Sequence, residues 1–424
     1  MNNLKPSKSE LIKLLEYFNS ERYKEAEILA LSITEKFPNH PFGWKILGSI
    51  LRKEGKVSEA LFFNKKAVKL DPEDANAHNN LGNNLNDLSR LVEAEESYRQ
   101  AIILNPNFAE AYNNLGNTLN SLQKPADAEE NFKKAIILRP GFSESRYSLG
   151  LLLYEAADYE KAIEYFKGSD FKKSQHYLLK CFFRQDNKSF FYDQLDHLIE
   201  KSEIDPMIGS LVCRSQLRYG LERPNLFCKY PLNYVLKKDL INQYDFENIF
   251  VKPAKNILNK GKIENKGQNL LINGYQTSGN LFDIESKITN KIKKIIYSEI
   301  EVYRNHFKDS AEGFLTSWPK HFTLYGWLIN MRNGGKLKPH MHDSGWISGS
   351  IYINVPLKSK TDSGNLVVCL EDQEYESEEN KDLKVSIDVI SGSLCFFPSS
   401  LLHYTIPFES DEERIVLAFD VVPK

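Results

Sequence analysis

The sequence predicts a multidomain α + β chain, in which a solenoid of helical repeats precedes a strand-rich barrel with flanking helices. Two observations predict this architecture: a 34-residue period in the first part of the chain, and short alternating strands in the last part. We expect the solenoid over residues 1–176, a divergent helical cap or linker over 177–225, and the barrel domain over 226–424.

The helical part repeats small and helix-stopping residues at a constant step of 34 residues. Four sets of positions keep this step: Gly48, Gly82, Gly116 and Gly150; Pro38, Pro72, Pro106 and Pro140; Leu47, Leu81, Leu115 and Leu149; and Ala26, Ala60, Ala94, Ala128 and Ala162. Small residues let two antiparallel helices approach closely, and a proline just past the second helix ends it. The pattern resembles the tetratricopeptide repeat, with clear repeats at about 41–74, 75–108, 109–142 and 143–176 and a degenerate one at 7–40.

The first helices of two repeats carry asparagines at equivalent positions, which we expect to face partly into the concave groove. They are Asn80 and Asn114, and Asn83 and Asn117. Stacked side-chain amides can hydrogen-bond an extended peptide, as the resemblance to peptide-binding repeats implies. The alternative is a solvated polar face that keeps the solenoid soluble. We expect a protein or peptide partner in the groove, with these four asparagines as candidate contacts.

Bulk composition argues against several classes of function. The chain has 424 residues and a net charge of −2, which gives no reason to expect a nucleic-acid partner. We find no run of about 18 apolar residues that would span a membrane, and no apolar core of a signal peptide at the N-terminus. The five cysteines form no closely spaced pair. We therefore expect reduced thiols and a cytoplasmic protein without a membrane partner.

Short strands dominate the last part of the chain. Strand-like runs occur at 322–332, 347–356, 365–370, 384–390, 393–398 and 414–422, and Gly, Ser and Asp residues separate them. Such a series is typical of a barrel or of a jelly roll, the double-stranded β-helix. An amphipathic helix over 284–307 is consistent with a helical layer outside the sheet.

Three histidines stand out in this strand-rich part. His340 and His342 are two residues apart, so on a strand they share one face. His403 reaches them only if a later strand returns beside the first, which a jelly roll provides. Imidazoles and carboxylates suit Fe(II), and three protein ligands leave positions open for a co-substrate and oxygen. Arg414 begins the strand after His403, where its guanidinium can bind a carboxylate through two hydrogen bonds.

These residues form a pattern that resembles the 2-oxoglutarate- and Fe(II)-dependent dioxygenases, close to their prolyl-hydroxylase-like branch. Within that group, the pattern is most similar to the bacterial oxygenases fused to tetratricopeptide repeats. The matching motifs are the pair His340 and His342, Ser348-Gly349 with Tyr352, Gly364 with Leu366, Gly392 followed by Phe397-Pro398-Ser399, His403, and Arg414. The resemblance covers residues 322–420 and extends weakly over 225–320.

The resemblance implies Fe(II), the co-substrate 2-oxoglutarate and O2, and a reaction that hydroxylates a C–H bond of a peptide, a protein or a small molecule. It implies that 2-oxoglutarate chelates the iron while Arg414 binds its C5 carboxylate. His340, His403 and Arg414 would then be the catalytic residues. Tyr325 is a further candidate for a hydrogen bond to 2-oxoglutarate.

One position departs from the family's pattern, which places Asp or Glu two residues after the first histidine. Three alternatives follow for the third iron ligand. His342 binds and makes an all-histidine site, or Asp343 swings in through a local bulge, or only His340 and His403 bind and water completes the site. We favour His342, because the charge of 2-oxoglutarate would neutralise an all-histidine centre.

Two classes of function fit the whole sequence. The first is a dioxygenase whose solenoid presents a substrate or docks a partner. The second is a catalytically inactive repeat adaptor, which binds proteins through the solenoid groove. The combination of His340, His403 and Arg414 in one chain favours the enzyme.

Overall fold

A computed structural model describes residues 5–259, 265–266, 270–284, 287–358, 360–371 and 383–424. The chain divides into two compact units, Met1–Gln185 and Asp186–Lys424, and each is described by itself. The division falls inside the segment 177–225 that the sequence marks as a divergent helical region.

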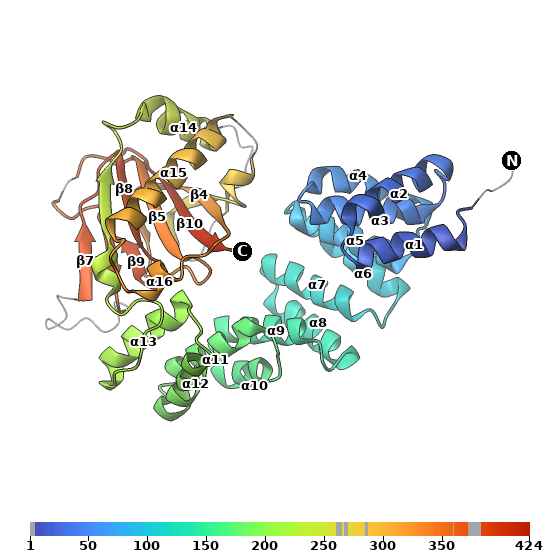
Figure 1. The fold of residues 1–424 in the computed structure, drawn as a ribbon, viewed down its shortest axis with the longest axis horizontal. Coiled ribbons are helices and arrows are strands. Elements are labelled where there is room, and N and C mark those ends of the chain that lie inside the picture. Colours follow the sequence, from blue (N-terminus) through green and yellow to red (C-terminus); the bar gives the residue numbers. More distant parts are fainter. Residues whose placement is uncertain (1–4, 260–264, 267–269, 285–286, 359, 372–382) are drawn as a thin grey trace. The chain divides into compact units, whose positions relative to one another are not determined.

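The first unit consists of paired antiparallel helices, as the 34-residue period predicts (Figure 1). The helices are α1 (Lys8–Asn19), α2 (Tyr23–Lys36), α3 (Pro41–Lys53), α4 (Val57–Leu70), α5 (Ala75–Asp87), α6 (Leu91–Leu104), α7 (Ala109–Ser121), α8 (Pro125–Leu138), α9 (Ser143–Glu155), α10 (Tyr159–Lys167) and α11 (Lys172–Arg184). The repeated prolines fall two residues after α2, α4, α6 and α8, where they end each second helix. This unit is therefore a tetratricopeptide-type solenoid, which confirms the fold predicted from the 34-residue period.

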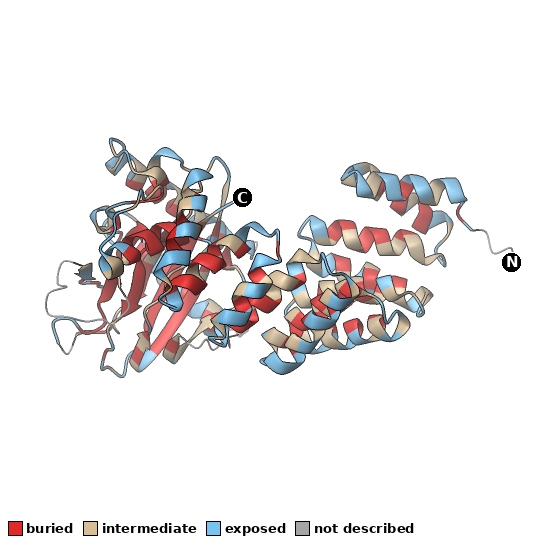
Figure 2. Ribbon diagram, turned by 90° about the horizontal axis from the view of Figure 1, so that it is seen from below, coloured by how far each residue is buried: buried red, intermediate tan, exposed pale blue. Residues whose placement is uncertain are grey.

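Glycines set the distance between the two helices of a repeat. A Cβ added at Gly116 would lie 2.7 Å from the ring of Phe132, and one added at Gly150 would lie 2.6 Å from the ring of Phe166. Both rings are buried, so each first helix packs directly onto an aromatic side chain of its second helix. In Figure 2 the helices of this unit accordingly carry a buried stripe and an exposed outer face.

The second unit contains two antiparallel sheets and a set of helices. The helical segments are α12 (Lys188–Glu200), α13 (Pro206–Tyr219), η1 (Pro231–Tyr234), η2 (Glu247–Val251), α14 (Lys252–Asn259), η3 (Leu281–Asp283), α15 (Lys287–His306) and α16 (Gly313–Thr316). The strands are β1 (Leu236–Asp239), β2 (Asn265–Lys266), β3 (Leu271–Thr277), β4 (Phe322–Leu337), β5 (Ile347–Asn354), β6 (Leu366–Cys369), β7 (Lys384–Ile387), β8 (Ser393–Pro398), β9 (Leu402–Thr405) and β10 (Arg414–Pro423). The large sheet has the order β1-β8-β5-β10-β4-β3-β2 and the small sheet the order β7-β6-β9. This is the jelly roll that the sequence predicts.

Strand β10 lies at the centre of the large sheet, between β4 and β5, and is buried on both faces. Its side chains alternate between two cores. Ile415, Leu417, Phe419 and Val421 face a helical layer with α14 and α15, whereas Val416 and Ala418 face the small sheet. The space between the two sheets is therefore lined by the same face of β10 that carries Arg414.

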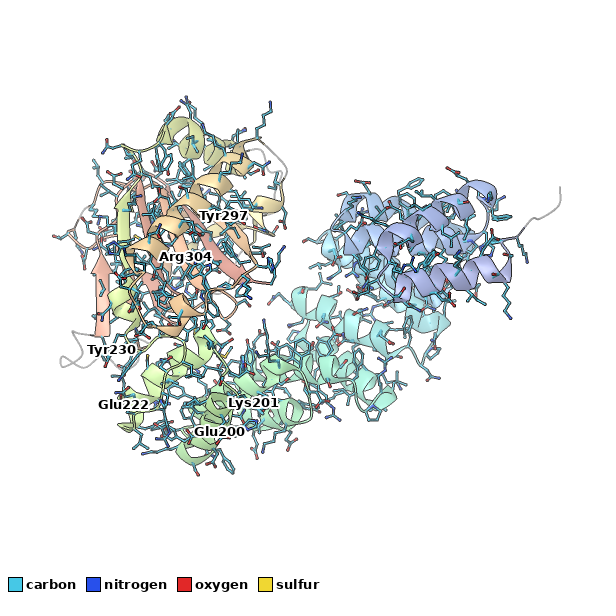
Figure 3. The ribbon with its side chains drawn as sticks, viewed as in Figure 1. Glu200, Lys201, Glu222, Tyr230, Tyr297 and Arg304 are labelled. Carbon is cyan, nitrogen blue, oxygen red and sulfur yellow. The ribbon has the colours of Figure 1, made fainter. Side chains whose placement is uncertain are left out.

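Helix α15 crosses the outer face of the large sheet and packs against the start of β4 and the residues just before it. Two of its residues, Tyr297 and Arg304, are labelled in Figure 3. The ring of Tyr297 lies 5.5 Å from that of Phe322, and the guanidinium of Arg304 lies 4.8 Å from the ring of Trp318. These contacts fix the start of β4, which borders β10 along its whole length. Among the described helices, none combines the length and apolar character needed to cross a bilayer.

Candidate metal centre and co-substrate pocket

The backbone brings the first and third histidines face to face. His340 precedes β5 and His403 lies in β9, and the two form an isolated antiparallel bridge. The His340 amide donates to the His403 carbonyl at 3.1 Å, and the His403 amide donates to the His340 carbonyl at 2.8 Å. Residues opposite each other in such a bridge have neighbouring side chains, so their imidazoles lie together across 63 residues of sequence. Strand β9 therefore runs beside the segment that carries His340, as the predicted jelly roll requires.

The three imidazoles of His340, His342 and His403 form one cluster. One ring nitrogen from each lies within 4.8 Å of the other two. The Nε2 atoms of His340 and His342 are 3.3 Å apart. Two nitrogens that each bind one ion at about 2.1 Å are roughly 3.0–3.4 Å apart when the bond angle is near 90–110°. The spacing of this pair fits a shared ion, and the third imidazole belongs to the same group.

Hydrogen bonds at the far side of two rings orient their Nε2 atoms toward each other. Nδ1 of His340 donates to the carbonyl of Lys338 at 2.8 Å. Nδ1 of His342 donates to Oδ1 of Asp420 at 2.8 Å. A proton held on Nδ1 fixes the tautomer in which Nε2 carries the lone pair, and this is the usual way in which proteins orient a metal-binding imidazole.

Asp420 is held in turn by a buried hydroxyl. Ser348 donates to Oδ1 of Asp420 at 2.7 Å and lies 2.9 Å from the hydroxyl of Ser399. Ser348 and Ser399 belong to the motifs that carry the oxygenase resemblance. Their contacts give these two residues a physical role, because Ser348 holds the carboxylate that orients His342 and Ser399 holds the Ser348 hydroxyl.

The surroundings keep two of the imidazoles neutral. Burial, followed by the charge of His342, lowers the pKa of His340 to about 4. Burial also lowers the pKa of His403 well below its ordinary value. Burial alone would lower the pKa of His342 as well, but the Asp420 carboxylate raises it above the ordinary value. Since only a neutral imidazole binds a metal, His340 and His403 are ready to bind at neutral pH.

A cavity of about 300 Å³ between the two sheets joins the histidines to Arg414. Its walls include Trp327, Met341, Tyr352 and Thr405. Thr405 lies two residues after His403 on β9, so the two side chains share a face of the strand. A ligand in this cavity can therefore touch the metal-binding nitrogens and the guanidinium together.

Arg414 is fully buried and lacks an anionic partner among the described residues. Its Nη1 donates to the carbonyl of Gly364, but Nε and Nη2 have no hydrogen-bond partner in the described part of the chain. Burial lowers the pKa of Arg414, and the neighbouring Tyr352, whose ring centre lies 5.1 Å from the guanidinium carbon, opposes this effect. A buried, unpaired guanidinium is costly by several kcal/mol in general, and a bound carboxylate would remove that cost.

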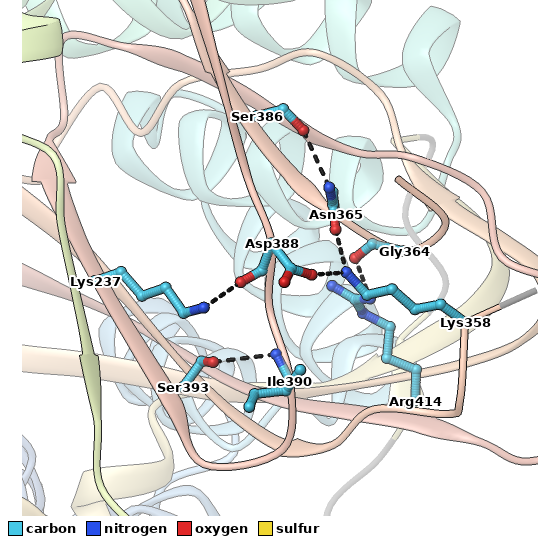
Figure 4. Close-up of polar contacts among 9 residues, drawn as sticks. All are labelled: Lys237, Lys358, Gly364, Asn365, Ser386, Asp388, Ile390, Ser393 and Arg414. Carbon is cyan, nitrogen blue, oxygen red and sulfur yellow. Dashed lines mark hydrogen bonds and ion pairs between the residues drawn. The ribbon is translucent and has the colours of Figure 1, made fainter. Parts of the chain in front are cut away.

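The loop that carries Gly364 is fixed by a polar network, shown in Figure 4. Lys358 contacts both Oδ1 of Asn365 and the carboxylate of Asp388. Asn365 also donates to the hydroxyl of Ser386 at 3.2 Å. The network anchors the residue that follows Gly364, so it helps to set where the Gly364 carbonyl meets Arg414.

Tyr325 lies at the other end of the pocket from Arg414. It pairs with Asp420 in the register between β4 and β10, whereas Arg414 pairs with Met331. Six residues of strand separate the two positions, which corresponds to about 20 Å between their Cα atoms. Tyr325 therefore lines the cavity beside the histidines and is out of reach of a carboxylate on Arg414, and Tyr352 is the tyrosine at the guanidinium.

The carboxylate that contacts the histidine cluster belongs to Asp420, and not to Asp343, which the sequence suggested as an alternative iron ligand. Asp343 is absent from the group of metal-competent side chains, although its charge contributes to the raised pKa of His342. Sequence reasoning missed Asp420, which stands in an apolar strand run as its one acidic residue. That isolated acid in a buried strand was the available signal, since a buried carboxylate needs a partner.

The asparagines of the solenoid are partly engaged with one another. Nδ2 of Asn114 donates to Oδ1 of Asn83 at 3.0 Å and to Oδ1 of Asn79 at 3.1 Å. Asn80 donates to the hydroxyl of Ser49 at 3.2 Å. Asn117 is half-buried on the same helix as Asn114. Asn80 and Asn83 line a cavity of about 400 Å³ in the first unit.

Comparison with known protein families gives both parts of the chain a class. Residues 325–420 match the family described as "Putative 2OG-Fe(II) oxygenase". Three tetratricopeptide-repeat models match residues 82–123, 109–142 and 143–169. The same chain thus matches tetratricopeptide-repeat models and the model described as "Putative 2OG-Fe(II) oxygenase", which confirms the two resemblances seen in the sequence.

Individual relatives match the repeats. The protein O-mannosyl-transferase Tmtc3 of Drosophila melanogaster is 42% identical over 52 residues, which is 12% of this chain and 6% of that protein. Among solved structures, PilF of Pseudomonas aeruginosa is 21% identical with a TM-score of 0.41, covering 45% of this chain and 89% of that one. YrrB, described as a TPR protein with an unusual peptide-binding site, is 20% identical with a TM-score of 0.35, covering 40% of this chain and 91% of that one.

Proposed function

We propose that this chain is an Fe(II)- and 2-oxoglutarate-dependent dioxygenase that hydroxylates a C–H bond of a peptide, protein or small molecule. The observation that carries the proposal is the pairing of two incomplete groups in one cavity. A cluster of three imidazoles lies at one end, and a buried guanidinium with unpaired Nε and Nη2 atoms lies at the other. A dicarboxylate that binds a metal through one end and Arg414 through the other would complete both.

The residues present fit the implied metal. Two imidazoles are oriented through Nδ1, and the third, His403, has a buried Nδ1 without a partner in the described residues. Three protein ligands leave positions open for a bidentate co-substrate and oxygen, as in other mononuclear iron sites. The charges also balance: Fe(II) and Arg414 contribute three positive charges, and Asp420 with dianionic 2-oxoglutarate contributes three negative ones.

The iron, when bound, would supply the activation of O2. The chain's own residues do the rest. His340, His342 and His403 would hold the metal, and Asp420 keeps the proton of His342 on Nδ1. Arg414 and Gly364 would orient the C5 carboxylate, while Trp327, Met341 and the other apolar walls exclude bulk water from the cavity.

The repeats would recruit the substrate or a partner protein to the oxygenase unit. Their groove offers half-buried amides, and repeat solenoids expose extended concave surfaces of this kind for binding. The five cysteines are free and buried, which supports placing the protein in a reducing compartment such as the cytoplasm.

Succinate formation tests the proposal. The full chain is incubated with Fe(II), ascorbate and 2-oxoglutarate under air, and succinate is measured without any added substrate, since such enzymes turn over slowly when uncoupled. We expect succinate from the wild type and none from His403→Ala. His306→Ala is the matched control, because His306 is exposed on α15 and should leave the rate unchanged.

The competing candidate is a repeat adaptor with an inactive barrel. It predicts no succinate and no Fe(II) binding in the wild type, and equal behaviour of the two histidine variants. That result would contradict the dioxygenase proposal.

A further inference from the structure

One repeat of the solenoid lacks the aromatic residue that packs against the glycine of the first helix in three other repeats. Gly82, Gly116 and Gly150 each face an aromatic ring on the second helix of the same repeat, and those rings belong to Tyr98, Phe132 and Phe166. The equivalent residue of the repeat formed by α3 and α4 is Asn64, which lies against Gly48. A short polar side chain therefore stands where three successive repeats have an aromatic one.

Asn64 is buried and unsatisfied. Its exposed fraction is 1%, and neither Nδ2 nor Oδ1 has a hydrogen-bond partner among the described residues. A buried polar group left without a partner costs about 1–3 kcal/mol. Most buried polar groups in natural proteins have a hydrogen-bond partner, so an unsatisfied one calls for a specific explanation, and a bound ligand is one.

The missing ring leaves a hollow that opens toward the concave groove. Asn64 is part of the wall of the cavity of about 400 Å³, together with residues of α1, α3 and α5. Among them are Asn80 and Asn83, whose side chains face the same space. In the next repeat the longer side chain of Tyr98 reaches Oδ1 of Asn83 at 2.8 Å, which shows that a side chain from this position can reach the groove behind the first helix. Both polar atoms of Asn64 are closed to solvent, so its side chain has to turn toward the cavity to meet a ligand.

The basic residues of this cavity are largely neutralised. Lys45 forms an ion pair with Asp74 at 2.6 Å, and Arg52 forms one with Asp87 at 2.6 Å. Lys53 lies over the ring of Tyr23, 5.4 Å from its centre. Two of the three positive charges are thus balanced and that of Lys53 remains. At Asn64 itself the unsatisfied atoms are one neutral donor group and one neutral acceptor.

We propose that the hollow beside Asn64 binds a primary carboxamide, the side chain of an asparagine or glutamine in an extended peptide that lies along the groove. A carboxamide has one acceptor and one donor side by side, so it can pair with Nδ2 and Oδ1 of Asn64 through two parallel hydrogen bonds. A carboxylate could not donate, an ammonium could not accept, and a hydroxyl offers a single atom for two partners.

Selection from a random peptide library displayed on phage, with the full chain as bait, tests this site. We expect asparagine or glutamine to be enriched at one peptide position with the wild type. The selected peptide is then titrated as synthesised and with that Gln replaced by Met, a residue of similar length without an amide. The replacement should weaken binding about tenfold, as expected for a lost pair of buried hydrogen bonds.

Variants at position 64 assign the effect to this residue. In Asn64→Leu the number and branching of the side-chain heavy atoms are kept and the amide is lost, so the Gln-to-Met change in the peptide should no longer alter affinity. Asn64→Phe should fill the hollow as Phe132 does in its own repeat, raise the urea midpoint and abolish binding. Asn131→Leu is the control, because the Asn131 amide donates to the Asp127 carbonyl of its own helix.

Three results would overturn the inference: no peptide selected, no amide enriched, or an equal cost of the peptide change in the wild type and Asn64→Leu. The inference builds on the recruiting role proposed for the repeats, but its test involves neither iron nor succinate. Failure here would leave the dioxygenase proposal standing, and failure of succinate formation would leave the peptide result intact.

Discussion

Oδ1 of Asp420 accepts a hydrogen bond from Nδ1 of His342 at 2.8 Å, although 78 residues separate them in the sequence. The related oxygenases carry an acidic residue at the position of His342, where it would touch the metal directly. In this chain the carboxylate of Asp420 instead accepts a hydrogen bond from the far side of the His342 imidazole. A carboxylate bound to a ligand imidazole makes that ligand more basic and fixes its orientation.

Replacement of Asp420 should weaken metal binding. Asp420→Asn keeps the side-chain shape but removes the charge, and the loss of such a partner typically costs about 10–100-fold in metal affinity. Anaerobic calorimetric titration of Fe(II) into the full chain measures the change. Asp411→Asn, in an exposed position, is the control. Equal Fe(II) affinities for wild type and Asp420→Asn would show that the carboxylate does not support the metal.

Metal binding should depend on pH through His342. The Asp420 carboxylate raises the pKa of His342 above its ordinary value, so without metal this imidazole holds its proton to a higher pH than a free imidazole does. A metal must displace that proton. Affinity for Fe(II) should therefore be constant well above this pKa and fall about tenfold per pH unit below it, with one proton released per ion bound.

The Asp420→Asn variant lacks the carboxylate that raises the pKa of His342. Without the carboxylate the pKa of His342 falls, so the decline in affinity should begin at a lower pH than in the wild type. Titrations in buffers of different ionisation enthalpy count the released protons. A decline at the same pH in both proteins would mean that another group controls it.

Arg414 should lower the stability of the ligand-free protein and raise its affinity for 2-oxoglutarate. Arg414→Met removes a buried guanidinium with two unpaired nitrogens, so the free energy of unfolding of the ligand-free protein should rise by about 1 kcal/mol or more. The affinity for 2-oxoglutarate should fall about 100-fold, since two charge-assisted hydrogen bonds are lost. Urea unfolding and anaerobic titration of 2-oxoglutarate measure the two effects.

The matched control is Arg332→Met on the neighbouring strand, where the side chain is 71% exposed. Arg332→Met should change neither the free energy of unfolding nor the affinity for 2-oxoglutarate. A destabilised Arg414→Met protein that still binds 2-oxoglutarate would show that the guanidinium serves the fold and not the co-substrate.

Lys358 should act on co-substrate binding without touching the co-substrate. Lys358→Met breaks the contacts to Asn365 and Asp388 and loosens the loop that holds the Gly364 carbonyl on Arg414. Because the lost interactions are partly exposed, we expect an effect of about 1 kcal/mol, which is about a fivefold rise in KM for 2-oxoglutarate. The kcat should stay within about twofold, since the histidine cluster is not involved.

Lys360→Met, an exposed lysine in the same loop, serves as the comparison. The two KM and kcat values come from succinate formation at varied 2-oxoglutarate. If kcat falls in Lys358→Met while KM is unchanged, the network supports the metal centre instead of the guanidinium.

Several features could be predicted from the sequence because they depend on local spacing. The 34-residue step fixes the repeats, since each repeat meets its neighbour through the same few positions. The histidines and Arg414 could be found because they stand at fixed offsets from strand and turn motifs. The return of β9 beside His340 followed from the expected jelly roll.

Other features depend on which strands become neighbours, and spacing alone does not give that. Asp420 meets His342 because β10 runs beside β5 and ends near the start of that strand. The sequence offered Tyr325 as a candidate for a hydrogen bond to 2-oxoglutarate, but the strand register places Tyr352, and not Tyr325, beside Arg414. Asn64 was not singled out in the sequence, because its unpaired amide depends on the packing around it.

The proposed function requires that three imidazoles share one iron while Arg414 holds the far end of 2-oxoglutarate. A crystal structure of the full chain, prepared anaerobically with Fe(II) and 2-oxoglutarate, tests this most directly. We predict an anomalous iron peak within bonding distance of a nitrogen of His340, His342 and His403, and the C5 carboxylate on Nε and Nη2 of Arg414. Iron bound by Asp343 or by two histidines and water, or a co-substrate that leaves Arg414 unpaired, would contradict it.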